Sequence, residues 1–211
     1  MTVMLVLGGV RSGKSRLAER LAGAYERVTY VAPGPVPDPV APQDAEWRER
    51  VRAHQLRRPA HWVTRETGDV PGAINSVASE SAGGRGAVLV DCLGTWTTRL
   101  IDDAGAWEER DRAVGVVEQG CARLGSALES TGGAGVDVIL VSNEVGLGVV
   151  PAHVSGRLFR DALGQVNQCA SAVADRMALV VAGRVVDLTG FPTVDDVAMG
   201  WGNARFGRRG A

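Results

Sequence analysis

Lysine is almost absent from this sequence. Of the 23 basic residues, Lys14 is the single lysine and the rest are arginines. An ammonium is a compact point charge that fits between phosphate oxygens, whereas a guanidinium is a broad planar fork. A chain that uses arginine everywhere else keeps its one lysine where a compact cation is needed. Lys14 is therefore a candidate functional residue before any motif is considered.

The sequence also lacks long apolar runs, an excess of charge and a paired set of cysteines. No apolar run reaches about 18 residues and no charged leader precedes the first glycines, so we expect neither export nor a membrane span. The formal net charge of -1 gives no reason to expect a nucleic-acid or membrane surface. Cys92, Cys121 and Cys169 are far apart in sequence and indicate buried thiols in a reducing cytoplasm. We expect a cytoplasmic protein that acts on a small molecule.

Length and composition favour one domain. At 211 residues with 45% hydrophobic content, the chain has the size of a single α/β core. From Phe191 onward glycine, arginine and aspartate dominate. We therefore expect residues 1–190 to form the domain and residues 191–211 to form a peripheral or disordered tail.

Residues 8–15 form a complete phosphate-binding loop. An apolar run at 3–7 predicts a strand before it, and helix formers at 15–22 predict a helix after it. In this pattern the lysine reaches the β- and γ-phosphates and the serine hydroxyl ligates Mg²⁺. The sequence therefore predicts a P-loop nucleotide-binding enzyme. The loop residues predicted to bind the nucleotide are Gly8, Gly9, Val10, Arg11, Ser12, Gly13, Lys14 and Ser15.

The rest of the pattern alternates between strands and helices. Apolar runs that end in polar residues predict buried parallel strands, and apolar residues three and four apart predict crossover helices. Five prolines within 33–42 predict a long flexible loop. We expect a single doubly wound, mostly parallel α/β domain of the RecA-like P-loop type with an antiparallel edge hairpin. The predicted strands are 3–7, 28–32, 87–90, 136–141, 178–182 and 185–188, and the predicted helices are 15–22, 44–56, 106–128 and 155–174.

Two acids follow predicted strands. Asp91 has the position of a Walker B acid that holds or orients Mg²⁺, and a helix N-cap is the alternative. Glu144 either lines the same edge of the sheet or caps a turn. The carboxyl edge of the sheet is therefore the predicted site.

His54 lies on the predicted helix 44–56, on the same face as Trp47. The pattern permits two interpretations, a half-buried hydrogen-bonded residue or a catalytic histidine. Arg57 and Arg58 could contact phosphates or form ordinary surface charge, and Glu66 could bind a ribose or a base. The pattern alone leaves these alternatives open.

Several segments, in order from residue 3 to about 186, resemble the bifunctional adenosylcobinamide kinase / adenosylcobinamide-phosphate guanylyltransferase family of cobalamin biosynthesis. Asn143-Glu144-Val145-Gly146 is the most specific part of the resemblance. The segments that carry it are the loop at 8–16, His54 with 58–62, and the segments 90–93, 141–151, 157–161 and 167–168.

The resemblance implies two activities. Adenosylcobinamide is phosphorylated with ATP or GTP, and GMP is then transferred from GTP to adenosylcobinamide phosphate through a histidine-bound GMP, with loss of pyrophosphate. It implies that His54 is that histidine, that Mg²⁺ binds at Ser15 and Asp91, and that the protein is a homotrimer. The further residues implied to contact the nucleotide are Pro33, Gly34, Pro35, Gln55, Leu56, Arg57, Arg58, Glu66 and Asp91.

Two rival functions fit the motif. A monofunctional P-loop kinase would move the γ-phosphate alone and use His54 structurally. A nucleotide-dependent switch would have a conformational output. Covalent GMP on the protein distinguishes the first rival from the bifunctional enzyme.

Overall fold

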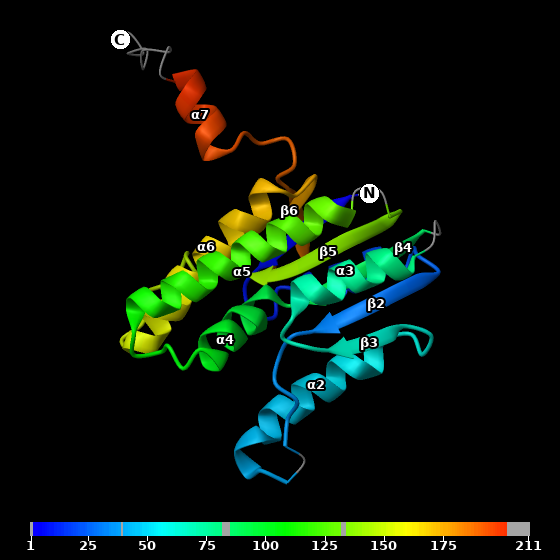
Figure 1. The fold of residues 1–211 in the computed structure, drawn as a ribbon, viewed down its shortest axis with the longest axis horizontal. Coiled ribbons are helices and arrows are strands. Elements are labelled where there is room, and N and C mark those ends of the chain that lie inside the picture. Colours follow the sequence, from blue (N-terminus) through cyan, green and yellow to red (C-terminus); the bar gives the residue numbers. More distant parts are fainter. Residues whose placement is uncertain (1, 39, 82–84, 132–133, 202–211) are drawn as a thin grey trace.

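The computed structural model describes residues 2–38, 40–81, 85–131 and 134–201 and contains a seven-stranded sheet (Figure 1). The strand order is β3-β2-β4-β5-β1-β6-β7. All neighbouring strands are parallel except β6 and β7, which form an antiparallel hairpin at one edge. The strands are β1 (Val3–Gly8), β2 (Arg27–Ala32), β3 (Val63–Glu66), β4 (Gly86–Asp91), β5 (Val136–Asn143), β6 (Arg176–Val181) and β7 (Arg184–Asp187).

Helices cover both faces of this sheet. Alternate β1 residues point to opposite faces, so Leu5 and Leu7 join one apolar core while Val6 joins the other. The core that contains Leu5 also takes residues from α3, α4, α5 and α6, and the core that contains Val6 takes residues from α1. The helices are α1 (Lys14–Ala22), α2 (Ala45–Arg57), α3 (Val70–Glu80), α4 (Leu93–Asp103), α5 (Arg110–Ser130), α6 (Val154–Ala172) and α7 (Val194–Trp201), with a 3-10 turn at Pro42–Asp44.

The predicted doubly wound α/β fold with an edge hairpin is confirmed. The central strands match their predicted ranges to within two residues, because each is a buried apolar run. The single helix expected at 106–128 is wrong at its start: α5 begins at Arg110, and α4 precedes it after β4. β3 and α3 were not expected. β3 gave little signal because Val63–Glu66 is a short and largely polar segment. The apolar residues Val70, Ile74 and Val77 of α3 do have helical spacing and could have predicted it.

Residues 191–201 continue beyond the edge hairpin, and α7 projects away from the sheet in Figure 1. The end of the predicted tail, residues 202–211, lies outside the described residues. The division into a domain and a tail stays a prediction. None of the described helices is both long and apolar enough to cross a membrane.

Candidate nucleotide site

The P-loop connects β1 to α1 at the carboxyl edge of the sheet. Gly13 has φ 101°, which is in the left-handed region that favours glycine. A Cβ on Gly8 would lie 2.6 Å from the carbonyl oxygen of Val180, so this position admits no side chain. Lys14 begins α1, is buried, and donates from Nζ to the Gly9 carbonyl at 3.3 Å. The loop therefore presents an ammonium and a helix N-terminus to the same space.

Asp91 ends β4 and faces Ser15 across the site. The Ser15 hydroxyl donates to Asp91 Oδ1 at 3.3 Å, and the Tyr30 hydroxyl donates to Asp91 Oδ2 at 3.1 Å. Tyr30 is 1% exposed, and burial together with the Asp91 charge raises the pKa of its phenol well above the ordinary value. A hydroxyl and a carboxylate side by side at a P-loop are the oxygen ligands that Mg²⁺ takes, so the pair fits that ion.

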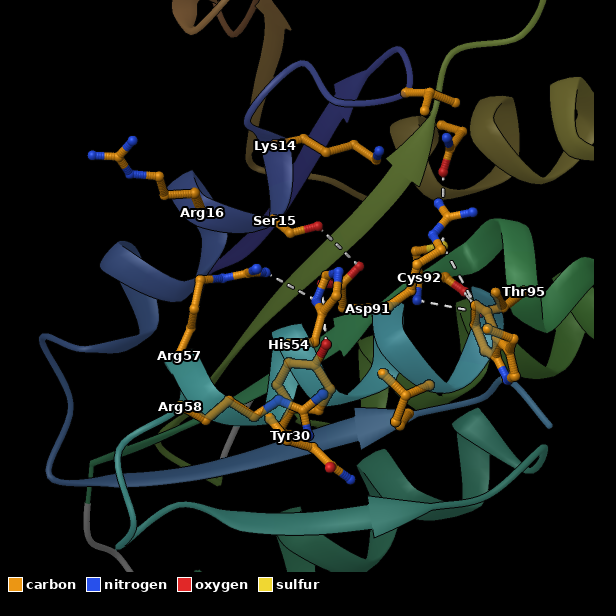
Figure 2. Close-up of a pocket in the computed structure, with 18 of the residues that line it drawn as sticks. Lys14, Ser15, Arg16, Tyr30, His54, Arg57, Arg58, Asp91, Cys92 and Thr95 are labelled. Carbon is orange, nitrogen blue, oxygen red and sulfur yellow. Dashed lines mark hydrogen bonds and ion pairs between the residues drawn. The ribbon is translucent and has the colours of Figure 1, made fainter. Parts of the chain in front are cut away.

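His54 lies in the last turn of α2 and points into this group (Figure 2). Its Nδ1 is 3.6 Å from Asp91 Oδ2, 3.8 Å from Glu19 Oε1 and 3.1 Å from Arg57 Nη2. Burial lowers the pKa of His54 and Arg57 acts in the same direction, while Asp91 and Glu19 oppose the shift. A histidine with a lowered pKa is neutral near pH 7, as a nitrogen nucleophile must be.

Arg58 and Glu66 form the wall beyond His54. The Arg58 guanidinium lies over the Tyr30 ring, 3.4 Å from the centroid, and its Nη1 is 3.4 Å from Thr64 Oγ1. Its Nε is buried and has no hydrogen-bond partner within the described ranges. Glu66 ends β3 and lines the same cavity. Arg58 and Glu66 thus bring a guanidinium and a carboxylate to the lining of one cavity.

The described residues between β2 and the 3-10 turn, 33–38 and 40–41, form no helix or strand, as the prolines predict, and this segment packs against α2. Trp47 Nε1 donates to the Pro35 carbonyl at 2.9 Å. Arg48 donates to the carbonyls of Asp38 and Ala41 at 2.7 and 2.6 Å. None of the 13 residues of α2 is buried, so these polar contacts hold the helix that carries His54.

Polar groups also follow β5. The Asn143 carbonyl accepts from Asn167 Nδ2 at 3.0 Å, and Asn143 Oδ1 lies 3.7 Å from Cys92 Sγ. Burial and the charge of Asp91 raise the pKa of the Cys92 thiol. Glu144 accepts a hydrogen bond from the Gly146 N–H. Of the two roles expected for Glu144, the structure therefore shows the one in which it caps a turn.

These groups enclose one cavity of about 440 Å³. Gly8, Gly9, Pro33 and Leu56 are not among its lining residues, and the Leu56 side chain is 77% exposed. The sequence-predicted residues that line it are Val10, Arg11, Ser12, Gly13, Lys14, Ser15, Gly34, Pro35, His54, Gln55, Arg57, Arg58, Glu66 and Asp91.

Sequence reasoning missed Tyr30 and Thr95 as lining residues and Glu19 behind them. Glu19 follows Ser15 by four residues on a helix, a spacing that places both on one face and that could have found it. Tyr30 could not be recognised as a site residue, because a tyrosine within an apolar strand is typical of the hydrophobic core. The three cysteines are free thiols, as predicted, although Cys121 alone is fully buried and Cys92 and Cys169 are partly buried. Cys169 Sγ donates to the Cys121 carbonyl at 3.4 Å, between α5 and α6.

The sheet, the P-loop and the Ser15–Asp91 pair define a P-loop nucleotide-binding protein. Solved structures agree on the fold. A type III secretion ATPase superposes with a TM-score of 0.58 at 10% identity over 93% of this chain, which spans 60% of that ATPase. The ATPase EscN from enteropathogenic E. coli superposes with a TM-score of 0.55 at 12% identity. The match covers 86% of this chain and 43% of EscN. At these identities the likeness concerns the fold alone.

The sequence comparisons are more specific. The family described as "Cobinamide kinase / cobinamide phosphate guanyltransferase" matches residues 4–188, and the chain belongs to it. The "Bifunctional adenosylcobalamin biosynthesis protein CobP" of Pseudomonas aeruginosa is 39% identical over 192 residues, 89% of this chain and 98% of that protein. CobU of Salmonella typhimurium, with the same description, is 34% identical over 86% of this chain and 96% of its own.

Proposed function

We propose that this chain phosphorylates adenosylcobinamide with ATP or GTP and then transfers GMP from GTP to adenosylcobinamide phosphate, releasing pyrophosphate. Family membership and the bifunctional relatives support it. The observation that carries it is one cavity that holds both a P-loop lysine and His54, with Asp91 3.6 Å from the imidazole. A phosphate-binding group and a nucleophile then act on one triphosphate.

In the guanylyl transfer, Nε2 of His54 is the attacking atom, since Nδ1 faces Arg57, Glu19 and Asp91. The Nε2 lone pair forms a bond to the α-phosphorus of GTP. The bond from that phosphorus to the bridging oxygen breaks, and pyrophosphate leaves with the electron pair. A phosphate oxygen of the acceptor then attacks the same phosphorus, and the electrons of the N–P bond return to Nε2.

In the phosphorylation, the P-loop holds the triphosphate through Lys14 and its backbone N–H groups. Ser15 and Asp91 would hold Mg²⁺, which neutralises charge on the transferred phosphoryl group. The Tyr30 hydroxyl keeps the Asp91 carboxylate oriented toward this position. Both reactions therefore share Lys14, Ser15 and Asp91.

The wall formed by Glu66 and Arg58 is suited to guanine. Guanine presents N–H donors on one edge, which a carboxylate accepts, and acceptors on another, which a guanidinium donates to. Both residues line the cavity that also holds the P-loop and His54, which supports a base contact there.

The test is covalent labelling with GTP that carries its label on the α-phosphate. We expect acid-labile, alkali-stable label on the wild type and none on His54→Ala, which keeps its phosphorylation activity. His61→Ala, an exposed histidine of the same segment, is the control and stays labelled. Folded wild-type protein that takes up no label contradicts the guanylyl transfer and leaves the monofunctional kinase.

The switch alternative predicts GTP hydrolysis without an acceptor. The bifunctional enzyme consumes GTP steadily when adenosylcobinamide is present, and with GTP alone it stops after one equivalent. A homotrimeric assembly and a cytoplasmic location stay predictions of the sequence.

A further inference from the structure

Glu19 lies on α1 behind the cavity wall and is absent from the cavity lining. Its carboxylate pairs with Arg57 through two hydrogen bonds, from Nε to Oε2 at 3.0 Å and from Nη2 to Oε1 at 3.0 Å. Its side chain is 10% exposed, and Oε1 is 3.8 Å from Nδ1 of His54. A nearly buried carboxylate that does not reach the cavity acts through Arg57 or through His54.

Two carboxylates lie within 4 Å of His54 Nδ1, and they are not equivalent. Asp91 already accepts hydrogen bonds from the hydroxyls of Ser15 and Tyr30 and is the expected ligand of Mg²⁺. In the part of the chain that the structure describes, the Glu19 carboxylate hydrogen-bonds to Arg57 alone. Each carboxylate thus accepts two hydrogen bonds, and the bound ion separates them. Asp91 would ligate Mg²⁺, so Glu19 is the carboxylate left to accept from His54.

The contact between Arg57 and His54 favours one tautomer of the ring. A guanidinium can only donate, so this contact favours the tautomer in which Nδ1 accepts from Arg57 and the ring proton is on Nε2. A protonated Nε2 has no lone pair with which to attack phosphorus. Attack through Nε2 requires the proton on Nδ1, with an acceptor beside it.

Resting on the proposed function, we infer that Glu19 is a positioning residue for guanylyl transfer. When Arg57 turns from Nδ1 to a phosphate oxygen of GTP, Glu19 accepts the hydrogen bond from Nδ1–H and orients Nε2 toward the α-phosphorus. A shift of about 1 Å brings Oε1 into hydrogen-bond range. Formation of the N–P bond leaves the ring positively charged, and the Glu19 carboxylate balances that charge. Before the attack the ring exchanges its proton with solvent, losing one from Nε2 and taking one at Nδ1, since the His54 side chain is 31% exposed. That proton then stays on Nδ1 through both transfer steps.

The test compares the two activities of Glu19→Gln. In Glu19→Gln the amide oxygen accepts from Arg57, which leaves the amide NH2 to donate to Nδ1. This holds the ring proton on Nε2, which is the wrong tautomer for attack. We expect the rate of protein labelling by GTP to fall by about 10²- to 10⁴-fold. Phosphorylation of adenosylcobinamide, which does not use His54, changes little. Glu19→Asp keeps a carboxylate and recovers part of the labelling rate.

Glu26→Gln is the matched control, because Glu26 is an exposed acid between α1 and β2. We expect this variant to keep both activities. A second comparison separates His54 from Arg57. In an Arg57→Ala variant Glu19 no longer has a guanidinium to hold in place. Adding Glu19→Gln to that variant lowers the labelling rate further only if Glu19 also acts on His54.

Three outcomes overturn the inference: labelling of Glu19→Gln at the wild-type rate, equal loss of both activities, or no additional loss in the Arg57→Ala background. Failure of the proposed function looks different. There the wild type itself takes up no label.

Discussion

The two sides of the cavity are built differently. On the P-loop side, α1 buries Lys14, Ala18 and Ala22 against the sheet, and the loop follows a central strand. On the other side, α2 buries none of its residues and lies beside β3, at the edge of the sheet (Figure 1). Triphosphate binding thus rests on the apolar core, whereas the nucleophile rests on a few polar contacts at the surface.

This difference separates changes that affect every reaction of the triphosphate from those that affect one. A defect in the P-loop removes the shared anchor. A defect in α2 displaces His54 and leaves the anchor in place. Substitutions on each side of the cavity, and where the two sides meet, test this difference through their effects on the two activities.

The largest effect is expected from Lys14→Arg, which keeps the charge but replaces the compact ammonium with a fork too broad for the buried position. We expect both activities to fall by about 10²-fold or more. Steady-state rates of phosphorylation and of protein labelling measure this. Arg20→Lys, an exposed change on the same helix, is the control and leaves both rates intact. Loss of one activity alone would contradict a shared anchor.

An intermediate effect is expected from Trp47→Ala, which removes the hydrogen bond to Pro35 and the ring that packs under the proline segment. A loss of about 1.4 kcal/mol raises the KM for GTP in labelling about tenfold. The KM of the phosphoryl donor changes little. Trp47→Phe keeps a ring without the N–H and gives a smaller rise. Equal increases in both reactions would show that α2 serves both sides.

The smallest effect is expected from Tyr30→Phe, which removes one hydrogen bond to Asp91 at the junction of the two sides. We expect about 1 kcal/mol less stability and a higher Mg²⁺ requirement in both reactions. Urea unfolding and Mg²⁺ titrations measure these. Tyr25→Phe is the control, since its hydroxyl bonds to the remote Asp137 at 2.6 Å and its loss leaves the Mg²⁺ requirement unchanged. A shift in one reaction only would exclude a shared ion.

The sequence predicted the P-loop side well because its signals are local. A glycine loop between a strand and a helix has one interpretation, and Asp91 ends an apolar run. The α2 side could not be predicted from pattern in the same way. His54 gave two interpretations, and the choice between them depended on a resemblance rather than on periodicity.

The contacts of Glu19 with Arg57 and His54 join residues 35 to 38 positions apart. Long-range polar contacts of this kind leave no periodic signal in one sequence. Leu56 came from the range of contacts that the resemblance implied, and its side chain lies on the exposed side of α2, outside the cavity lining. Its contact with the nucleotide stays a prediction.

The position of β3 at the end of the sheet has an evolutionary consequence. β3 pairs with β2 alone, so the unit formed by α2 and β3 can change without altering the pairing of β2, β4, β5 and β1. A P-loop ancestor could acquire a nucleotidyl-transfer chemistry by remodelling this unit while its phosphate anchor stayed intact. The edge of the sheet is thus where new reactions can be added to this fold, and the centre is where the old one is kept.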